Sequence, residues 1–241
     1  MDFTPYIVAA ILFLAAYLQS ATGFGLALVC MALLPLVLPV TDAIAYVAIA
    51  SLSVNLFILY ANRAGLRWKS ILLLGLAIAL GIPIGYFGLR AIDGELVIRL
   101  LGIVLMAIAV WEFLQSRIQR WSIPDWAGAP LSFVGGILAG AFNVGGPPIV
   151  VYVFSRKWTK VEMVAALQAI FVFGSVTRNA LMVGNGEYTA DLLLLVVLSI
   201  PGALLGVWLG KLTLDRLPKD LLKRIVFALI FLIGLRYVIS G

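Results

Sequence analysis

The chain has 241 residues, of which 63% are hydrophobic and only 12% charged. Soluble domains are about 45–50% apolar and about 25% charged, so the composition excludes a soluble globular protein and predicts an all-α polytopic membrane protein. A single cysteine and 23 glycines without a regular period exclude a disulfide-rich scaffold and a collagen-like chain.

Apolar stretches separated by charges and Gly/Pro clusters predict ten helical segments. Their approximate ranges are 5–20, 25–39, 42–62, 69–89, 95–114, 127–142, 147–156, 161–183, 189–211 and 219–239. A spanning helix needs about 20 residues, so the seventh segment is too short to cross, and the first, second and sixth are marginal. We therefore expect eight to ten segments, some of them short or broken at the midplane. The longest polar stretch, residues 115–126, is predicted to be a loop.

The first segment does not resemble a cleavable signal. Such a signal begins with basic residues, whereas this chain begins MDFTP and has no Lys or Arg before Arg63. We expect the segment to be retained as part of the membrane domain.

The net charge of +6 is explained by topology. Thirteen of the 17 Lys and Arg residues lie in or beside four alternate connections, around residues 63–69, 115–126, 156–160 and 211–224. The other connections contain only Arg90. The positive-inside rule then places these four connections in the cytoplasm and both termini outside. Insertion and contact with anionic lipid headgroups account for the charge, so no nucleic-acid partner is needed.

The two halves of the chain show similar landmarks. A Gly-rich break is followed by an acidic helix start and then by an Ile-Pro-Ile-Gly or Ile-Pro-Gly run. In chain order these are Gly25, Asp42 and Pro83, spaced by 17 and 41 residues, and Gly146, Glu162 and Pro201, spaced by 16 and 39. The spacing predicts repeats at 1–115 and 127–241, joined by a cytoplasmic linker at 116–126. Five segments per repeat is an odd number, so the repeats are predicted to have inverted topology, which is typical of secondary transporters.

The two breaks are the candidate substrate site. Non-helical backbone at membrane depth survives only where protein or a polar cavity surrounds it, and a helix that starts there directs free N–H groups at an anion. Two facing starts near Gly25 and Gly146 would bind a small oxyanion without a buried Lys. The alternative is that both breaks are packing turns where small residues let helices touch. The expected substrate contacts are Gln19, Ser20, Thr22, Gly23, Gly25, Asn143, Gly145, Gly146, Pro147, Gln168 and Arg178.

Some of these candidates have a second interpretation. Gln168, like Asn55, lies in the middle of an apolar segment, where an amide faces a pathway or hydrogen-bonds a neighbouring helix. Arg178 either attracts the anion or extends to the outer membrane surface. The glycines spaced by four at 81 and 85, at 136 and 140, and at 202, 206 and 210 are predicted to be helix packing faces.

The sequence lacks the residues of an enzyme. It has no His and no Walker A motif, and we find no nucleophile, metal or cofactor constellation. The sequence therefore predicts no catalytic residue, no metal and no cofactor. A membrane-embedded enzyme or a purely structural subunit is the least favoured class.

At these residues the chain resembles the sulfite exporter TauE/SafE family. The matching features are the break ATGFG at 21–25, the stretch GILAGAFNVGGPP at 136–148, the repeat of about 120 residues and the overall length. The resemblance covers essentially the whole chain. It implies transport of small sulfur-containing anions, such as sulfite or organosulfonates, across the bacterial cytoplasmic (inner) membrane. Family members differ in substrate and direction, so the resemblance does not imply export.

The leading hypothesis is a secondary transporter that moves such an anion by alternating access, with the two breaks as its midplane site. The alternative is an anion channel on the same scaffold. The expected partners are the lipid bilayer and the small anion. A coupling ion, proton or sodium, and a homodimer stay open.

Overall fold

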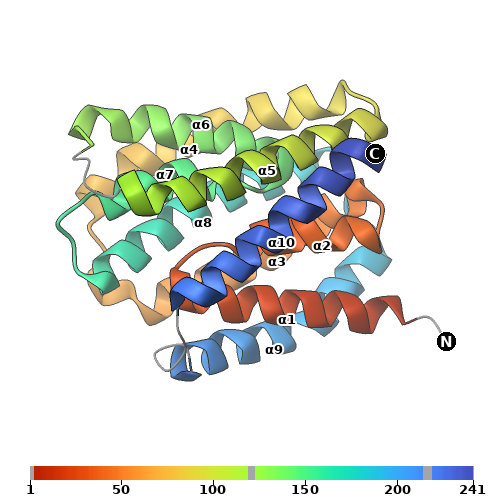
Figure 1. The fold of residues 1–241 in the computed structure, drawn as a ribbon, viewed down its shortest axis with the longest axis horizontal. Coiled ribbons are helices and arrows are strands. Elements are labelled where there is room, and N and C mark those ends of the chain that lie inside the picture. The colour runs from red at the N-terminus through yellow and green to blue at the C-terminus, as the bar shows by residue number, and fades with distance from the viewer. Residues whose placement is uncertain (1–2, 119–122, 214–218, 241) are drawn as a thin grey trace.

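A computed structural model of the chain describes residues 3–118, 123–213 and 219–240. The described residues form ten α-helices joined by short connections (Figure 1). The helices are α1 (Thr4–Thr22), α2 (Leu26–Leu33), α3 (Val40–Ala61), α4 (Trp68–Arg90), α5 (Gly94–Ile118), α6 (Gly128–Phe142), α7 (Gly146–Phe154), α8 (Lys160–Gly184), α9 (Ala190–Thr213) and α10 (Lys219–Ser240). Three short 3₁₀ helices are η1 (Leu34–Leu36), η2 (Arg63–Gly65) and η3 (Asp125–Ala127).

The long helices have the length and the surface of membrane spans. Among the described residues, α3, α4, α5, α8 and α9 contain windows that are long and apolar enough to cross a bilayer. Large apolar side chains such as Leu80, Leu198 and Leu232 are more than half exposed on the outside of the bundle. Lipid tails can solvate such side chains, whereas water cannot, so the chain is a multi-pass membrane protein.

Two helices are too short to cross. With 8 and 9 residues, α2 and α7 reach about 12–14 Å at 1.5 Å per residue, less than half of a membrane. Each packs on the helix before it and runs back toward the end where that helix began (Figure 1). The seventh segment, predicted to be too short, and the second, predicted to be marginal, are therefore half-length helices, whereas the first forms a helix of 19 residues and the sixth one of 15.

Both termini lie at one end of the molecule, opposite the ends of α3, α5, α7 and α9 (Figure 1). These four helix ends lead into the connections whose basic residues were counted above. The prediction that both termini share one side of the membrane is consistent with this arrangement.

Glycine rows set the closest helix contacts, in which α4 packs on α6 and α1 on α9. A Cβ added at Gly81 or Gly85 of α4 would collide with backbone carbonyl oxygens of Phe133 and Ile137 in α6. A Cβ at Gly206 of α9 would likewise meet a carbonyl oxygen of α1. The predicted packing faces are confirmed here. Gly202 has nothing within 4 Å of its added Cβ, so its prediction as a packing residue is wrong.

The predicted elements differ from the structure at one notable point. Residues 115–118 were expected to begin a loop, but they continue α5 to Ile118. Gln and Arg are good helix formers, and a helix end that reaches water tolerates their polarity. Residues 119–122 of the predicted linker lie outside the described residues.

Candidate functional site

The first break follows α1 and depends on two glycines. Gly23 has φ 81° and Gly25 has φ 111°, values that L-amino acids other than Gly and Asn rarely adopt. The N–H of Gly23 donates to the carbonyl of Gln19 at 2.7 Å, which ends α1. These conformations let the chain reverse inside the bundle and start α2 at Leu26.

The second break follows α6 and uses an asparagine where the first uses a glycine. Asn143 has φ 61°, the only positive φ among the described non-glycine residues. Its side-chain Nδ2 donates to the carbonyl of Ile44 in α3 at 2.8 Å. Asn tolerates this left-handed conformation better than most residues, and its amide also ties the break to α3.

The two half-helix starts offer different numbers of donors. At α2, the Leu26 N–H already donates to Oε1 of Gln19 at 3.1 Å, which leaves the next amides of the first turn, Ala27 and Leu28. At α7, Gly146 is followed by Pro147 and Pro148, which have no N–H. The prolines therefore leave the start of α7 poorer in N–H donors than the start of α2, and anion binding by the two helix starts stays a prediction.

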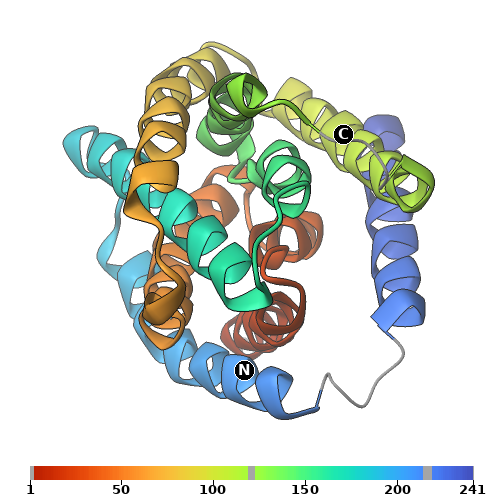
Figure 2. The ribbon, with the colours of Figure 1, turned by 90° about the vertical axis from the view of Figure 1, so that its left-hand side faces the viewer.

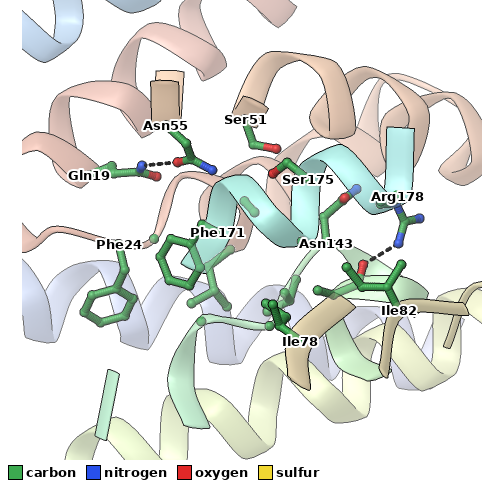
Figure 3. A pocket seen from close by; sticks show the side chains of 18 residues that line it. Gln19, Phe24, Ser51, Asn55, Ile78, Ile82, Asn143, Phe171, Ser175 and Arg178 are labelled. Atoms are coloured by element: carbon green, nitrogen blue, oxygen red, sulfur yellow. Dashed lines mark hydrogen bonds between the residues drawn. The ribbon is translucent and has the colours of Figure 1, made fainter. Parts of the chain in front are cut away.

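The two breaks enclose a cavity of about 70 Å³, space for a few water molecules. Figure 3 shows Gln19 and Asn55 at one side of it, with the rings of Phe24 and Phe171 near them, and Asn143 and Arg178 at the other side. Helix α8 forms one wall, since Phe171, Gly174 and Ser175 recur at helical spacing and all line the cavity. None of the described residues that line the cavity is acidic.

An amide network holds the first break in place. Nε2 of Gln19 donates to Oδ1 of Asn55 at 2.8 Å and to Oε1 of Gln168 at 3.3 Å. Nε2 of Gln168 donates to the carbonyl of Gly23 at 2.7 Å. All three amides are at least 96% buried, so each polar atom needs a protein partner. The interhelical hydrogen bonds expected as the alternative for Gln168 and Asn55 are present.

Arg178 lies inside the protein, not at its surface. The side chain is 3% exposed, so the alternative in which it extends to the membrane surface is wrong. Its guanidinium donates to the carbonyls of Ala139, Gly140 and Ala141, which end α6. A cation at a helix C-terminus is stabilised by the last carbonyls and the helix dipole. Nε of Arg178 is buried with no hydrogen-bond partner among the described atoms.

The structure brings together only part of the predicted substrate contacts. Six of them line the cavity, namely Gln19, Gly25, Asn143, Gly145, Gly146 and Arg178. Gln168 is fully buried behind it, where it binds the backbone of Gly23. Pro147 is also buried, and the side chain of Thr22 lies outside what the structure describes.

Ser20 does not point into the cavity. Its Oγ donates to the carbonyl of Tyr17 at 3.0 Å, and a Cβ added at Gly210 of α9 would collide with it. Ser20 therefore faces the contact between α1 and α9. Its position one residue after Gln19 explains this, because consecutive residues of a helix point about 100° apart.

The sequence did not single out several residues that line the cavity, among them Ser51, Phe171 and Ser175. These three residues lie inside α3 and α8, away from the two breaks. A signal did exist for α8, because residues 168, 171, 175 and 178 lie at intervals of three and four and so share one face.

Comparisons with known proteins support the resemblance. The model of the family "Sulfite exporter TauE/SafE" matches residues 8–237. A "Probable sulfite/organosulfonate exporter TauE" of Cupriavidus necator is 24% identical over 232 residues, which cover 93% of this chain and 90% of the relative. A "Probable inner membrane transporter protein TsaS" of Comamonas testosteroni is 24% identical over 176 residues, 72% of this chain and 73% of the relative. No solved structure matches the chain.

Proposed function

The chain belongs to the sulfite exporter TauE/SafE family, and from this premise we propose that it is a secondary transporter of a small sulfur oxyanion or organosulfonate. The bacterial cytoplasmic membrane is the proposed location. The central observation is the cavity between the two breaks, whose described lining contains Arg178 and several amides but no carboxylate. Arginine and amide N–H groups are the donors that sulfite and sulfonate oxygens accept.

We further propose alternating access between two inverted repeats. Helix packing supports the repeats. In the repeat, α1 corresponds to α6 and α4 corresponds to α9, and the contact of α4 with α6 has its counterpart in the contact of α9 with α1. The residues whose backbone the glycines approach also match. Phe133 and Ile137 of α6 lie 120 residues after Phe13 and Tyr17 of α1. Two similar halves of opposite orientation give inward-open and outward-open states of nearly equal energy.

The cavity can be narrowed at Gly146 without disturbing the fold. A Cβ added there lies 3.6 Å from Phe171 and 3.7 Å from Phe24, which is ordinary contact distance. Gly145 is unsuitable, because its added Cβ would collide with the carbonyl of Gly135. Gly146→Ala should therefore fold and place a methyl group between the two rings, and Gly146→Leu should fill the space.

Flux measurements in proteoliposomes test the proposal. Wild-type protein should move sulfite or an organosulfonate such as taurine or sulfoacetate, Gly146→Ala should reduce the flux, and Gly146→Leu should abolish it. Gly202→Ala makes the same change in a helix with open space around it, and its flux should equal that of the wild type. Unchanged flux in Gly146→Leu would remove the breaks from the site. Single-channel currents without a coupled ion would favour the anion channel instead.

A further inference from the structure

A second cavity, of about 390 Å³, lies at the end of the molecule that carries the termini. The start of α3, the end of α4, the start of α5 and the connection after α8 surround it. Arg178 lines both this outer cavity and the central one, so it stands at the wall between them. The other charged residues that line the outer cavity are Asp42, Arg90 and Glu187.

Glu187 places its carboxylate in a socket of donors. The Tyr86 hydroxyl donates to Oε1 of Glu187 at 2.5 Å, and Nη1 of Arg90 lies 3.2 Å from the same oxygen. Arg90 also donates to the Tyr86 hydroxyl at 3.0 Å, which orients the phenol. Both donors come from α4, whereas Glu187 comes from the connection between α8 and α9.

The socket recognises an oxyanion, not glutamate in particular. A phenol O–H and a guanidinium bind carboxylate, sulfonate and sulfite oxygens through the same charge-assisted hydrogen bonds. We propose that Tyr86 and Arg90 form an outer oxyanion site that Glu187 fills as a tethered ligand, and that a free oxyanion displaces Glu187 before it reaches Arg178. The proposed function enters only through the identity of the natural ligand, a sulfur oxyanion or sulfonate.

Net charge and tethering determine how strongly the Glu187 carboxylate competes with a free oxyanion for Tyr86 and Arg90. With Glu187 in place, two guanidinium groups face two carboxylates across the outer cavity, so the charges balance. Neutralising Glu187 leaves one positive charge in excess. A short tether gives a ligand an effective concentration on the order of millimolar, so a free anion below that range competes poorly in the wild type.

Acetate is the direct probe, because it is the untethered form of the Glu187 side chain. Acetate should raise the Tm of purified Glu187→Ala in detergent with an apparent Kd at least about tenfold lower than that of the wild type. Methanesulfonate should also stabilise Glu187→Ala with a lower apparent Kd than the wild type, because its oxygens accept from the same donors, Tyr86 and Arg90. Glu187→Gln keeps the shape of the side chain, so it serves if Glu187→Ala fails to fold, and it should also bind acetate more tightly than the wild type.

Two controls separate the site from general electrostatics. Glu95→Ala removes an exposed carboxylate at the same end of the molecule, where it pairs with Arg99 at 2.6 Å and does not line either cavity. It should bind acetate no better than the wild type. The double variant Glu187→Ala/Arg90→Gln should lose the tighter acetate binding that Glu187→Ala shows over the wild type.

The proposal of an outer site would be overturned if Glu95→Ala bound acetate as tightly as Glu187→Ala. It would also be overturned if neither Glu187→Ala nor Glu187→Gln bound acetate more tightly than the wild type. The measurement is independent of transport. A wild-type protein that moves no sulfur anion would reject the proposed function, whereas tighter acetate binding by Glu187→Ala would stand.

Discussion

Gln168 and Arg178 lie ten residues apart on α8 and act on different breaks. Gln168 binds the carbonyl of Gly23 after α1, and Arg178 binds the last carbonyls of α6. At about 1.5 Å per residue the two side chains are about 15 Å apart along the helix, with the cavity wall between them. One helix therefore positions both half-helix starts. The sequence indicates that each side chain is unusual in an apolar helix, but it does not indicate which backbone groups they bind.

Loss of the Gln168 amide should destabilise the protein. Gln168→Leu leaves the buried Gly23 carbonyl without its side-chain donor, and such a loss costs about 1–3 kcal/mol. Thermal unfolding in detergent should show a lower Tm. Asn185→Ala removes an exposed amide that donates to the Leu181 carbonyl at 2.7 Å, and its effect should stay within about 0.5 kcal/mol. Equal Tm losses in the two variants would contradict the role of Gln168.

At the scale of the elements, α4 is in close backbone contact with α6, the helix that leads into the second break. The glycines of α4 let its backbone touch α6 directly, and α6 in turn ends at the second break. The sequence indicates the packing faces through glycines spaced by four, which explains why most of them are confirmed. It does not separate Gly206, where an added Cβ would meet α1, from Gly202, where an added Cβ has nothing within 4 Å, because both fit the same spacing.

Two glycines of α4 provide a matched test of this contact. Gly85→Ala places a methyl group against the carbonyl of Ile137, and overpacking of this kind costs about 1–3 kcal/mol. Gly88→Ala has open space, and alanine favours a helix over glycine by up to about 1 kcal/mol. Thermal unfolding should therefore show a lower Tm for the first variant and an unchanged or higher Tm for the second. A Gly85→Ala variant as stable as Gly88→Ala would show that the two helices are not in backbone contact.

At the scale of the whole molecule, the fold separates the charges from the site. The helix ends that lead into the basic connections lie opposite the termini (Figure 1). Arg178 is the cation among the described residues that line the central cavity. Seen along the helices in Figure 2, α5 and α10 form a pair at one edge, in contact through Gly102 and Gly234. By the positive-inside rule the basic end is predicted to face the cytoplasm, and the proposed function assigns anion recognition to the one buried guanidinium.

The orientation predicts a labelling pattern. In a Cys30→Ala background, cysteine at exposed Asn185, near the end with the termini, should react with a membrane-impermeant maleimide on intact cells. Cysteine at exposed Lys157, in a basic connection, should react only after permeabilisation. The positive-inside rule is the physical basis. The reverse pattern would place the termini in the cytoplasm.

The sequence alone determined that the chain is a helical membrane protein, roughly where its segments lie, and where the two breaks lie. These features are local, since they depend on apolar runs, on Pro and Gly, and on charges between segments. Only the tertiary structure decided that Ser20 faces α9, that Gln168 supports the first break from behind, and that Arg178 ends α6 at the wall between two cavities. These outcomes depend on which helix faces meet, and residues as far apart in sequence as Gln19 and Gln168 become neighbours only when the whole bundle packs.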